Sequence, residues 1–467
     1  MTVLAIDQGT TSTRGILVGP NGECTEVFSA QHRQYYPRPG WVEHDPGELL
    51  ANVAACIDAA RPHGPLTIGL ANQGESCLAW DAKTGEAISK VIVWQDDRTA
   101  PRVRDMGGHS AFVLERTGLP LDPYFSASKL AWIMQEIPKA RDLLASGRLR
   151  LGTTDAFFRD RLTGRFETDI ATASRTSLMD IAKGEWDTDL CALFGVPLSA
   201  LPVITPCSGA MGTAAGVPLN ASIVDQQAAL FGHGCRASGQ TKVTFGTGAF
   251  VLALTGERLP TADGGPLPTV AWQEFDGPVL YALEGATYCA SAAVNWARQI
   301  GLLNDFNDLS NLEDASALQR GLAFVPALAG LACPHWNRSA RGAWLGLSLD
   351  TSRSDMLQAL LEGVAYRVAE VVSAIEAGVA VADPLLIDGG MSANPGFCQI
   401  VADITGRTVG VSNESERTSL GAAMLAGRVH GLRITPEGAA RVFAPRKDYQ
   451  ANHARFARAV ACVRDFA

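Results

Sequence analysis

The stretch LAIDQGTTSTRGILV, residues 4–18, decides the fold. An apolar run of strand-forming residues stops at Asp7, a short polar segment follows, and the chain then turns apolar again. Gly9 gives the backbone the freedom for a tight turn. The hydroxyl donors that follow are Thr10, Thr11 and Ser12. The pattern predicts a β-hairpin whose tip suits phosphate groups, with Asp7 placed to hold Mg²⁺ partly through water. A plain hairpin with a polar turn is the simpler explanation of these residues taken alone.

The composition is that of a globular protein with more than one core. The chain has 467 residues, of which 47% are hydrophobic and 19% charged. Its net charge of −9 argues against a nucleic-acid surface. The start, MTVLAIDQGTT, lacks the basic flank and long apolar core of a signal peptide. The longest uncharged stretch is interrupted by Pro326 and Pro334, which argues against a membrane span.

Cysteine and histidine usage points to a reduced, metal-poor interior. Ten cysteines are scattered without a C-x-x-C pair, and eight histidines show no metal-like spacing. We therefore expect free thiols and a cytoplasmic location, with neither membrane nor nucleic acid as partner. Two common nucleotide motifs are absent from the sequence, because no Gly is followed by Lys and no G-x-G-x-x-G follows a strand.

A second segment repeats the design of the first. TKVTFGTGAFVLAL, residues 241–254, again runs from a strand through a short Gly-rich turn into a strand. Two such hairpins predict two related domains, 1–240 and 241–467, that face each other. A third segment, residues 384–397, runs a strand into Gly389 and Gly390 before a helix start. Each segment alone is more often structural, but the three in this order favour a ligand site.

The chain resembles the FGGY family of carbohydrate kinases, and within it the glycerol kinases most of all. Motifs that carry the resemblance include AIDQGTTSTR, GWVEHDP, IVWQDDRT, TASRTSLMD, VDQQAALFG, FGTGAF, YALEGA, IDGGMSAN and TSLGAAMLAG. They extend in order to about residue 430. The resemblance implies an α/β fold of the actin-like ATPase (ribonuclease H-like) type, with two duplicated domains flanking a cleft. It also implies that the first domain binds the sugar or polyol and the second binds ATP.

Asp225 is the candidate general base. A hydroxyl becomes a useful nucleophile when a carboxylate accepts its proton during attack on phosphorus. Asp225 follows an apolar strand and precedes a helix start, a position that an N-cap Asp would also occupy. The resemblance implies the base role for Asp225 and a substrate contact for Gln226. Val224 departs from the family, which usually has Gly before the Asp.

The nucleotide side follows from the resemblance, residue by residue. It implies ATP and Mg²⁺ as cofactors, with Asp7 as the metal carboxylate and Arg14 neutralising charge that develops during transfer. The implied nucleotide contacts are Thr10, Thr11, Ser12, Arg14, Thr247, Gly390 and Asn394. Ser291 and Asn295 are weaker candidates, because the family often has Gly and Gln there and both residues also suit plain helix packing. Domain closure is expected to exclude water.

The substrate side departs from the family at one position. Glycerol kinases carry an Arg before the Glu that grips the acceptor, but here NQGES, residues 72–76, has Gly74 before Glu75. Trp94 and Tyr124 remain to wall the pocket. Either Gln73 or Arg98 compensates and glycerol is converted to glycerol 3-phosphate, which is the leading expectation, or the pocket takes a longer acceptor. The longer candidates are a tetritol or a ketose such as xylulose.

A different class of function stays open beside the kinase. The fold also serves non-catalytic sugar sensors, which would be expected to lose the base or the hairpin hydroxyls. Asp7, Thr10 and Asp225 are all present, which favours an enzyme. Apolar residues at three- and four-residue spacing predict a helix over 354–378, and the last stretch, 446–467, is expected to be a surface helix. A homodimer or homotetramer is expected.

Overall fold

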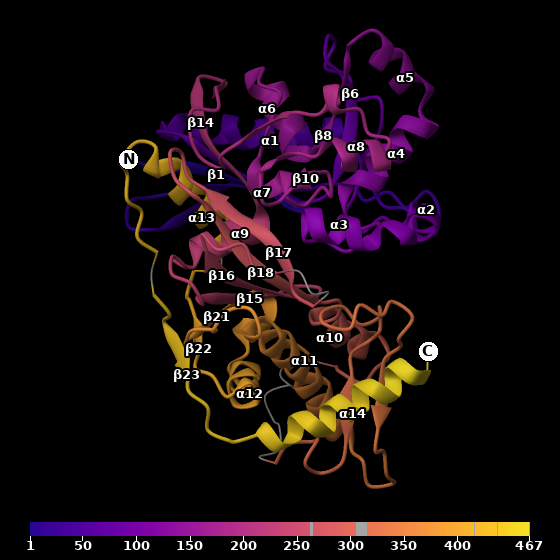
Figure 1. Cartoon of the computed structure of the whole chain (residues 1–467). Coiled ribbons are helices and arrows are strands. Elements are labelled where there is room, and N and C mark those ends of the chain that lie inside the picture. Colours follow the sequence, from indigo (N-terminus) through magenta and orange to yellow (C-terminus); the bar gives the residue numbers. More distant parts are fainter. Residues whose placement is uncertain (262–264, 305–314, 415, 437, 467) are drawn as a thin grey trace.

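The computed structural model describes residues 1–261, 265–304, 315–414, 416–436 and 438–466. The chain forms two α/β lobes, drawn mainly in indigo to magenta and in orange to yellow in Figure 1, with the long strands β16 and β18 lying between them. Among the described helices, none is both long and apolar enough to cross a membrane.

The first sheet is built around the hairpin that opens the chain. Its strands run in the order β13-β14-β5-β1-β2-β3. β1 pairs antiparallel with β2 and parallel with β5, which in turn pairs parallel with β14. The strands are β1 (Val3–Gln8), β2 (Ser12–Val18), β3 (Cys24–Gln31), β5 (Ile68–Asn72), β13 (Thr213–Ala214) and β14 (Val217–Val224). β1 and β5 are buried throughout, as expected for central strands covered on both faces.

The second sheet repeats this arrangement. Its order is β17-β18-β16-β15-β21-β22-β23. β15 pairs antiparallel with β16 and parallel with β21, just as β1 pairs with β2 and β5. The strands are β15 (Thr241–Phe245), β16 (Ala249–Gly256), β17 (Leu267–Gln273), β18 (Val279–Thr287), β21 (Leu385–Asp388), β22 (Val409–Val411) and β23 (Arg441–Phe443). The two hairpins predicted from the sequence therefore occupy equivalent places in two related sheets.

Smaller sheets extend both lobes. A four-stranded sheet contains β4 (Glu43–His44), β7 (Val91–Ile92), β6 (Cys77–Asp81) and β8 (Leu149–Thr153). Three two-stranded sheets pair β9 (Glu167–Asp169) with β12 (Val203–Thr205), β10 (Met179–Asp180) with β11 (Glu185–Trp186), and β19 (Ala323–Val325) with β20 (Ala343–Leu345).

The helices cover the sheets. Those of the first part of the chain are α1 (Pro46–Ala60), α2 (Ala100–Asp105), α3 (Ser110–Thr117), α4 (Ser126–Glu136), α5 (Pro138–Ala145), α6 (Thr154–Thr163), α7 (Ile170–Ala173), α8 (Thr188–Phe194) and α9 (Asp225–Gly232). The later ones are α10 (Ser291–Gln299), α11 (Arg353–Glu376), α12 (Pro395–Thr405), α13 (Arg417–Arg428) and α14 (Gln450–Phe466). Helix α11 matches the predicted 354–378, and α14 is the predicted C-terminal helix.

Local sequence explains where the second-lobe helices begin. Ser352 accepts a hydrogen bond from the Asp355 backbone while the Asp355 side chain accepts from the Ser352 backbone, which forms a capping box at the start of α11. Asn394 caps α12 by accepting from the backbone of Phe397, and Pro395 occupies the first helical turn.

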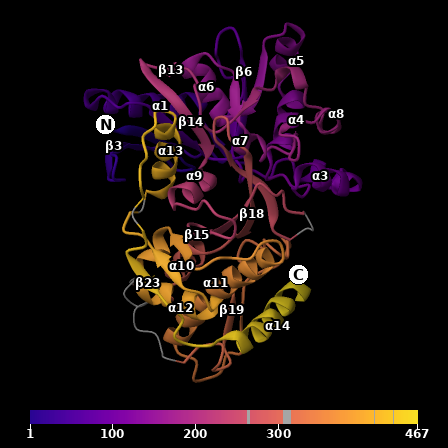
Figure 2. The same cartoon turned by 60° about the vertical axis from the view of Figure 1, so that its left-hand side comes forward.

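Helix α13 returns from the second lobe to pack on the first sheet, as the two views of Figures 1 and 2 agree. It crosses α9 at two glycines. A Cβ on Gly421 would lie 1.8 Å from the carbonyl oxygen of Ala228, and one on Gly232 would lie 2.0 Å from that of Arg417. Only glycine permits this approach of two helix backbones. The crossing fixes α9, whose first residue is Asp225.

Candidate active site

A cavity of about 420 Å³ is lined by residues from both halves of the chain. Ten of the residues singled out in the sequence line it: Thr10, Gln73, Gly74, Glu75, Trp94, Tyr124, Val224, Asp225, Gln226 and Thr247. They come from the first hairpin turn, the loops after β5 and β7, the segment before α4, the start of α9 and the second hairpin turn. The fold therefore gathers residues up to 237 positions apart, from Thr10 to Thr247, around one space.

Asp225 is the first residue of α9, directly after the buried strand β14. Its Oδ1 accepts a hydrogen bond of 2.7 Å from the Gln226 backbone N–H. Burial, and then the negative charges of Asp7 and Glu75, raise the pKa of Asp225 to about 7, while Lys242 opposes the rise. A carboxylate with this pKa can accept a proton near neutral pH, as a general base must.

Lys242 orients the neighbour of Asp225. Its fully buried ammonium donates hydrogen bonds to Oε1 of Gln226, at 2.6 Å, and to Oγ1 of Thr244, at 2.8 Å. Because Oε1 of Gln226 accepts from Lys242, the amide NH₂ of Gln226 is the group left for other partners. Sequence reasoning missed Lys242, although a lysine inside an otherwise uncharged strand was a visible signal.

The first hairpin carries a charged pair behind its turn. Asp7 and Arg14 face each other across β1 and β2, and Arg14 Nη2 lies 3.1 Å from Asp7 Oδ2. Arg14 Nη1 also lies 2.6 Å from Oε1 of Glu416, just before α13. Burial raises the pKa of Asp7, and Arg14 opposes this rise. Glu416 is 402 residues from Arg14 in the chain, so no local sequence pattern predicts this contact.

The turn itself is closed by a hydrogen bond from Gly9 N–H to the Ser12 carbonyl, at 3.0 Å. Thr11 is exposed, whereas Thr10 and Ser12 are half-buried. Thr10 connects the turn to the cavity wall, because its Oγ1 accepts a 3.0 Å hydrogen bond from the Trp94 indole. The turn thus presents hydroxyl groups next to the Asp7 and Arg14 pair.

The second hairpin turn is held by backbone contacts. The Thr247 carbonyl accepts from the N–H groups of Ala290 and Ala292, at 2.8 and 3.1 Å, and Ser291 N–H donates to the Gly246 carbonyl at 3.1 Å. The start of α10 is therefore fixed against this turn. Ser291 is half-buried there, while Asn295 is exposed one turn further along α10; neither lines the cavity.

The Gly-rich loop after β21 lies beside the same hairpin. Gly389 has φ +88°, and a Cβ there would lie 2.3 Å from the Phe245 carbonyl oxygen. Gly390 is exposed, with open space around its Cβ position. Asn394 caps α12 through its Oδ1, so its side chain already has a structural role. The predicted nucleotide residues Thr247, Ser291 and Gly390 thus lie at or beside the second turn.

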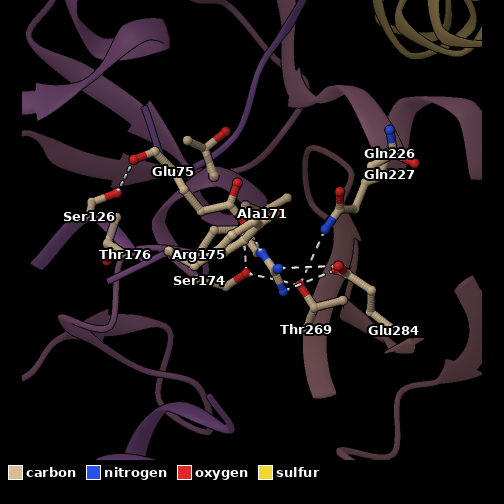
Figure 3. A network of polar contacts seen from close by, with 12 residues as sticks. Glu75, Ser126, Ala171, Ser174, Arg175, Thr176, Gln226, Gln227, Thr269 and Glu284 are labelled. Carbon is tan, nitrogen blue, oxygen red and sulfur yellow. Dashed lines mark hydrogen bonds and ion pairs between the residues drawn. The ribbon is translucent and has the colours of Figure 1, made fainter. Parts of the chain in front are cut away.

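The part of the cavity lined by Glu75 and Glu284, predicted to hold the acceptor, contains a buried ion-pair network (Figure 3). Arg175 Nε donates to Oε1 of Glu75 at 2.6 Å, and Arg175 Nη1 lies 3.1 Å from Oε2 of Glu284 on β18. Glu75 adopts φ +58°, a left-handed backbone that is strained for a residue with a side chain. Its carbonyl accepts a 2.9 Å hydrogen bond from Ser126. These contacts hold the strained loop in place.

Aromatic rings form the adjoining wall. The rings of Trp94 and Tyr124 meet at 5.5 Å and those of Tyr124 and Phe125 at 5.2 Å, all edge to face. The Trp94 indole N–H is committed to Thr10. Burial, and then Glu75, raise the pKa of the Tyr124 hydroxyl well above its usual value, so it remains a donor at any working pH.

The two positions that depart from the family touch each other. A Cβ on Gly74 would lie 3.5 Å from both methyl groups of Val224, an ordinary contact, and Gly74 is not in the left-handed region. The suggestion that Arg98 compensates for Gly74 is wrong. Its guanidinium is paired with Asp96 and stacked 3.8 Å over Trp41, and it does not line the cavity. Gln73 does line the cavity.

The residues of the first turn suit the groups that the expected phosphoryl transfer would require. Mg²⁺ is commonly bound through one or two carboxylates together with phosphate oxygens, and Asp7 supplies such a carboxylate beside the hydroxyl-rich turn. Among the described residues, no group of three or more His, Cys, Asp or Glu side chains forms a protein-only metal cage. A metal here would therefore rest on Asp7 and on the nucleotide.

Comparison with known protein families identifies the family to which this chain belongs. The N-terminal domain model of the FGGY family of carbohydrate kinases matches residues 2–232, and the C-terminal domain model matches residues 241–429. The chain belongs to the FGGY family of carbohydrate kinases. This FGGY kinase is 42% identical to a glycerol kinase from Alkalilimnicola ehrlichii, with 95% of this chain and 94% of the relative covered.

Solved structures agree with the family. The crystal structure of Plasmodium falciparum glycerol kinase with ADP superposes with a TM-score of 0.91 at 30% identity, covering 99% of this chain and 98% of the other. A ligand-bound xylulose kinase from Lactobacillus acidophilus shares the fold, with a TM-score of 0.86 at 20% identity and coverage of 100% and 97%. The expected two-domain FGGY fold and the expected ATP-dependent carbohydrate kinase activity are confirmed.

Proposed function

We propose that this kinase transfers the γ-phosphoryl group of ATP, with Mg²⁺, to a hydroxyl of a small neutral polyol, with glycerol as the leading acceptor and glycerol 3-phosphate as product. The single observation that carries the acceptor assignment is the placement of Glu75, Trp94, Tyr124 and Asp225 around one cavity. The similarity to glycerol kinases over 95% of the chain supports the same acceptor.

Asp225 is the general base in this proposal. Its carboxylate accepts the proton of the attacking hydroxyl as the oxygen–phosphorus bond forms, and its pKa of about 7 suits that task. Gln226 offers its amide NH₂ to an oxygen of the acceptor, since Lys242 occupies the amide oxygen. Trp94 and Tyr124 exclude water from one side of the acceptor.

Arg14 and the first turn complete the machinery. The Arg14 guanidinium stands beside Asp7 and can neutralise charge that grows on the transferred group. When bound, Mg²⁺ supplies charge neutralisation for the phosphate oxygens, held by Asp7. The phosphate groups of ATP accept hydrogen bonds from the hydroxyls of Thr10, Thr11 and Ser12. The rest of the nucleotide contacts Thr247, Ser291, Asn295, Gly390 and Asn394.

A coupled ADP-release assay tests the proposal. The purified chain is supplied with Mg²⁺ and ATP and screened against C3 to C6 polyols and ketoses. We expect glycerol to give the highest kcat/KM, with the phosphate on a terminal carbon. Higher kcat/KM for a tetritol or for xylulose would assign the longer acceptor that the Gly74 departure allows. ATP consumption that no polyol or ketose stimulates would overturn the proposal.

A further inference from the structure

The guanidinium missing at position 74 has a counterpart elsewhere in the part of the cavity lined by Glu75 and Glu284. Arg175 follows α7, with Ser174 between them, and its side chain is 2% exposed. It lies between Glu75 of the first lobe and Glu284 of β18, and the close view in Figure 3 shows it bridging the two. Arg175, Glu75 and Glu284 all line the cavity.

Arg175 has donor capacity left over. Nε is used by Glu75, and Nη2 lies 3.3 Å from Oε1 of Glu284 in a long hydrogen bond. Nη1 is buried and makes no hydrogen bond, although it lies within ion-pair distance of Glu284. A buried N–H group without a hydrogen-bond partner is rare, because it forfeits the partner that it had in water. A ligand oxygen in the cavity would satisfy it.

Other buried cations near the cavity are already committed. Lys129 donates to the Tyr124 carbonyl at 2.7 Å, and Lys242 donates to Gln226 and Thr244. Neither is among the described residues that line the cavity. Arg338 does line it, but its guanidinium grips Asp122 through two nitrogens and its side chain is 52% exposed. Arg175 is therefore the buried guanidinium facing this space.

The charge balance restricts the acceptor. Arg175 is shared by Glu75 and Glu284, and Asp225 lies close enough to raise the pKa of Tyr124 along with them. Two carboxylates, Glu75 and Glu284, thus flank one guanidinium, and the Asp225 carboxyl lines the same cavity. A neutral hydroxyl can donate to a carboxylate and accept from Arg175 in the same site. A carboxylate on the acceptor would instead meet like charges in a region of low dielectric.

We propose that Arg175 is the acceptor-binding cation of this enzyme: Nη1 donates to a hydroxyl oxygen that Glu75 also contacts, Glu284 holds the guanidinium in place from the second sheet, and the acceptors are neutral polyols rather than sugar acids. The inference rests on the proposed function and assigns to Arg175 the donation to the acceptor that Gly74 cannot make. The grip on the acceptor then spans both sheets, since Glu284 belongs to β18.

Isothermal titration of the full chain with glycerol tests the proposal without turnover, beside kcat and KM from the ADP-release assay. Arg175→Met should raise the glycerol Kd about 30-fold or more, the range expected for one charged hydrogen bond. Arg175→Lys should recover part of this loss, because it restores the charge without the fork. Glu284→Gln should weaken binding about three- to tenfold. Gluconate should not bind to the wild type.

Arg159→Met is the matched control. Arg159 is also fully buried and paired with a carboxylate, Glu167 at 2.5 Å, but it does not line the cavity. The control should lower the melting temperature as Arg175→Met does, with a glycerol Kd within twofold of wild type. A stability loss in Arg175→Met with unchanged Kd and KM would assign Arg175 a purely structural role and overturn the inference.

Three further outcomes separate the inference from the proposed function. If a longer polyol replaces glycerol as the best acceptor, the same variants are titrated with that polyol, and the expected changes are the same. If the wild type binds no polyol or ketose of the panel, the inference and the proposed function both fail. If the wild type binds a polyol and also binds gluconate with similar affinity, the charge argument alone is wrong.

Discussion

The two hairpins hold equivalent places in two related sheets, yet their chemistry differs at one matched register position. The second cross-strand pair from the turn is Asp7 with Arg14 in the first hairpin and Thr244 with Phe250 in the second. An ion pair therefore lies next to the first turn, whereas the backbone of the second turn is hydrogen-bonded to the start of α10. The duplicated fold supplies two short turns: the Asp7–Arg14 pair stands behind the first, whereas the second hairpin carries the buried Lys242 beside Thr244.

The same contrast extends beyond the hairpins. In the first lobe, Asp7, Glu75 and Asp225 are carboxyl groups whose pKa values burial raises. Around the second turn, Gly246 and Gly390 have almost open space where a Cβ would stand, which leaves room for a flat ligand. We infer that catalysis depends on the first lobe and nucleotide affinity on the second, and the predictions below test this division.

We expect substitution of Asp225 to cause the largest loss of activity. Asp225→Asn should lower kcat by about 10³-fold, within the range for a general base, because the amide cannot accept the hydroxyl proton. The Kd for ATP, measured by calorimetry, should stay within about threefold of wild type, because the second turn is untouched. Turnover near the wild-type rate would remove Asp225 from the base role.

A matched pair of hairpin variants gives the next largest effect. Arg14→Met should lower kcat about 100-fold, in the range seen when one charge-stabilising donor is lost, with a smaller change in the KM for ATP. Thr247→Ala should instead raise the KM for ATP a few-fold and leave kcat nearly unchanged. Steady-state kinetics at saturating glycerol separate the two patterns. Equal losses of kcat in both variants would contradict the division between the lobes.

The pH dependence of kcat/KM for the acceptor should follow the titration of the Asp225 carboxyl in the first lobe. Burial raises the pKa of Asp225 to about 7, and the deprotonated carboxylate is the active base, so activity should rise with pH. At pH 6 we expect kcat/KM about tenfold below its alkaline plateau. Lys242→Met should move the midpoint upward, because the Lys242 ammonium opposes the rise in the Asp225 pKa. A flat profile between pH 6 and 8.5 would argue against this assignment.

Sequence reasoning found the elements whose signals are local. The hairpins and the Gly389–Gly390 loop carry turn residues within a few positions of each other, and Asp225 follows an apolar strand directly at the start of α9. Charged contacts between segments that are distant in the chain could not be predicted from the sequence. Arg175 is 100 residues from Glu75 and 109 from Glu284, so nothing near any of them indicates the partner.

The packing of α13 was hidden for the same reason. The helix lies late in the sequence, within the expected second domain, yet it packs against β1, β5 and α9. The two glycines that allow its close crossing with α9, Gly232 and Gly421, lie in ordinary helical patterns. Their role depends on which helix lies opposite, and a single sequence does not contain that information.

The smallest effect, on acceptor preference, is expected at Gly74 and Val224. Gly74 has room for a Cβ, so Gly74→Ala should fold and behave nearly as wild type. A longer side chain there must pass the Val224 methyl groups at 3.5 Å, so we pair Gly74→Arg with Val224→Gly. A guanidinium at position 74 fills space that a longer polyol would use. The double variant should therefore shift the kcat/KM ratio of glycerol over C4 and C5 polyols about tenfold toward glycerol.

The background in which this double variant is made decides what it means. When the double variant is made in a chain that keeps Arg175, the new guanidinium at position 74 is partly repelled by Arg175. The double variant should then increase glycerol affinity only slightly. In an Arg175→Met background the new guanidinium should restore most of the lost glycerol affinity, because Glu75 regains a cationic partner. The comparison is a double-mutant cycle between positions 74 and 175, read from glycerol Kd values by calorimetry. Equal gains in both backgrounds would show that the two positions act independently and that Arg175 does not stand in for the residue that Gly74 replaces.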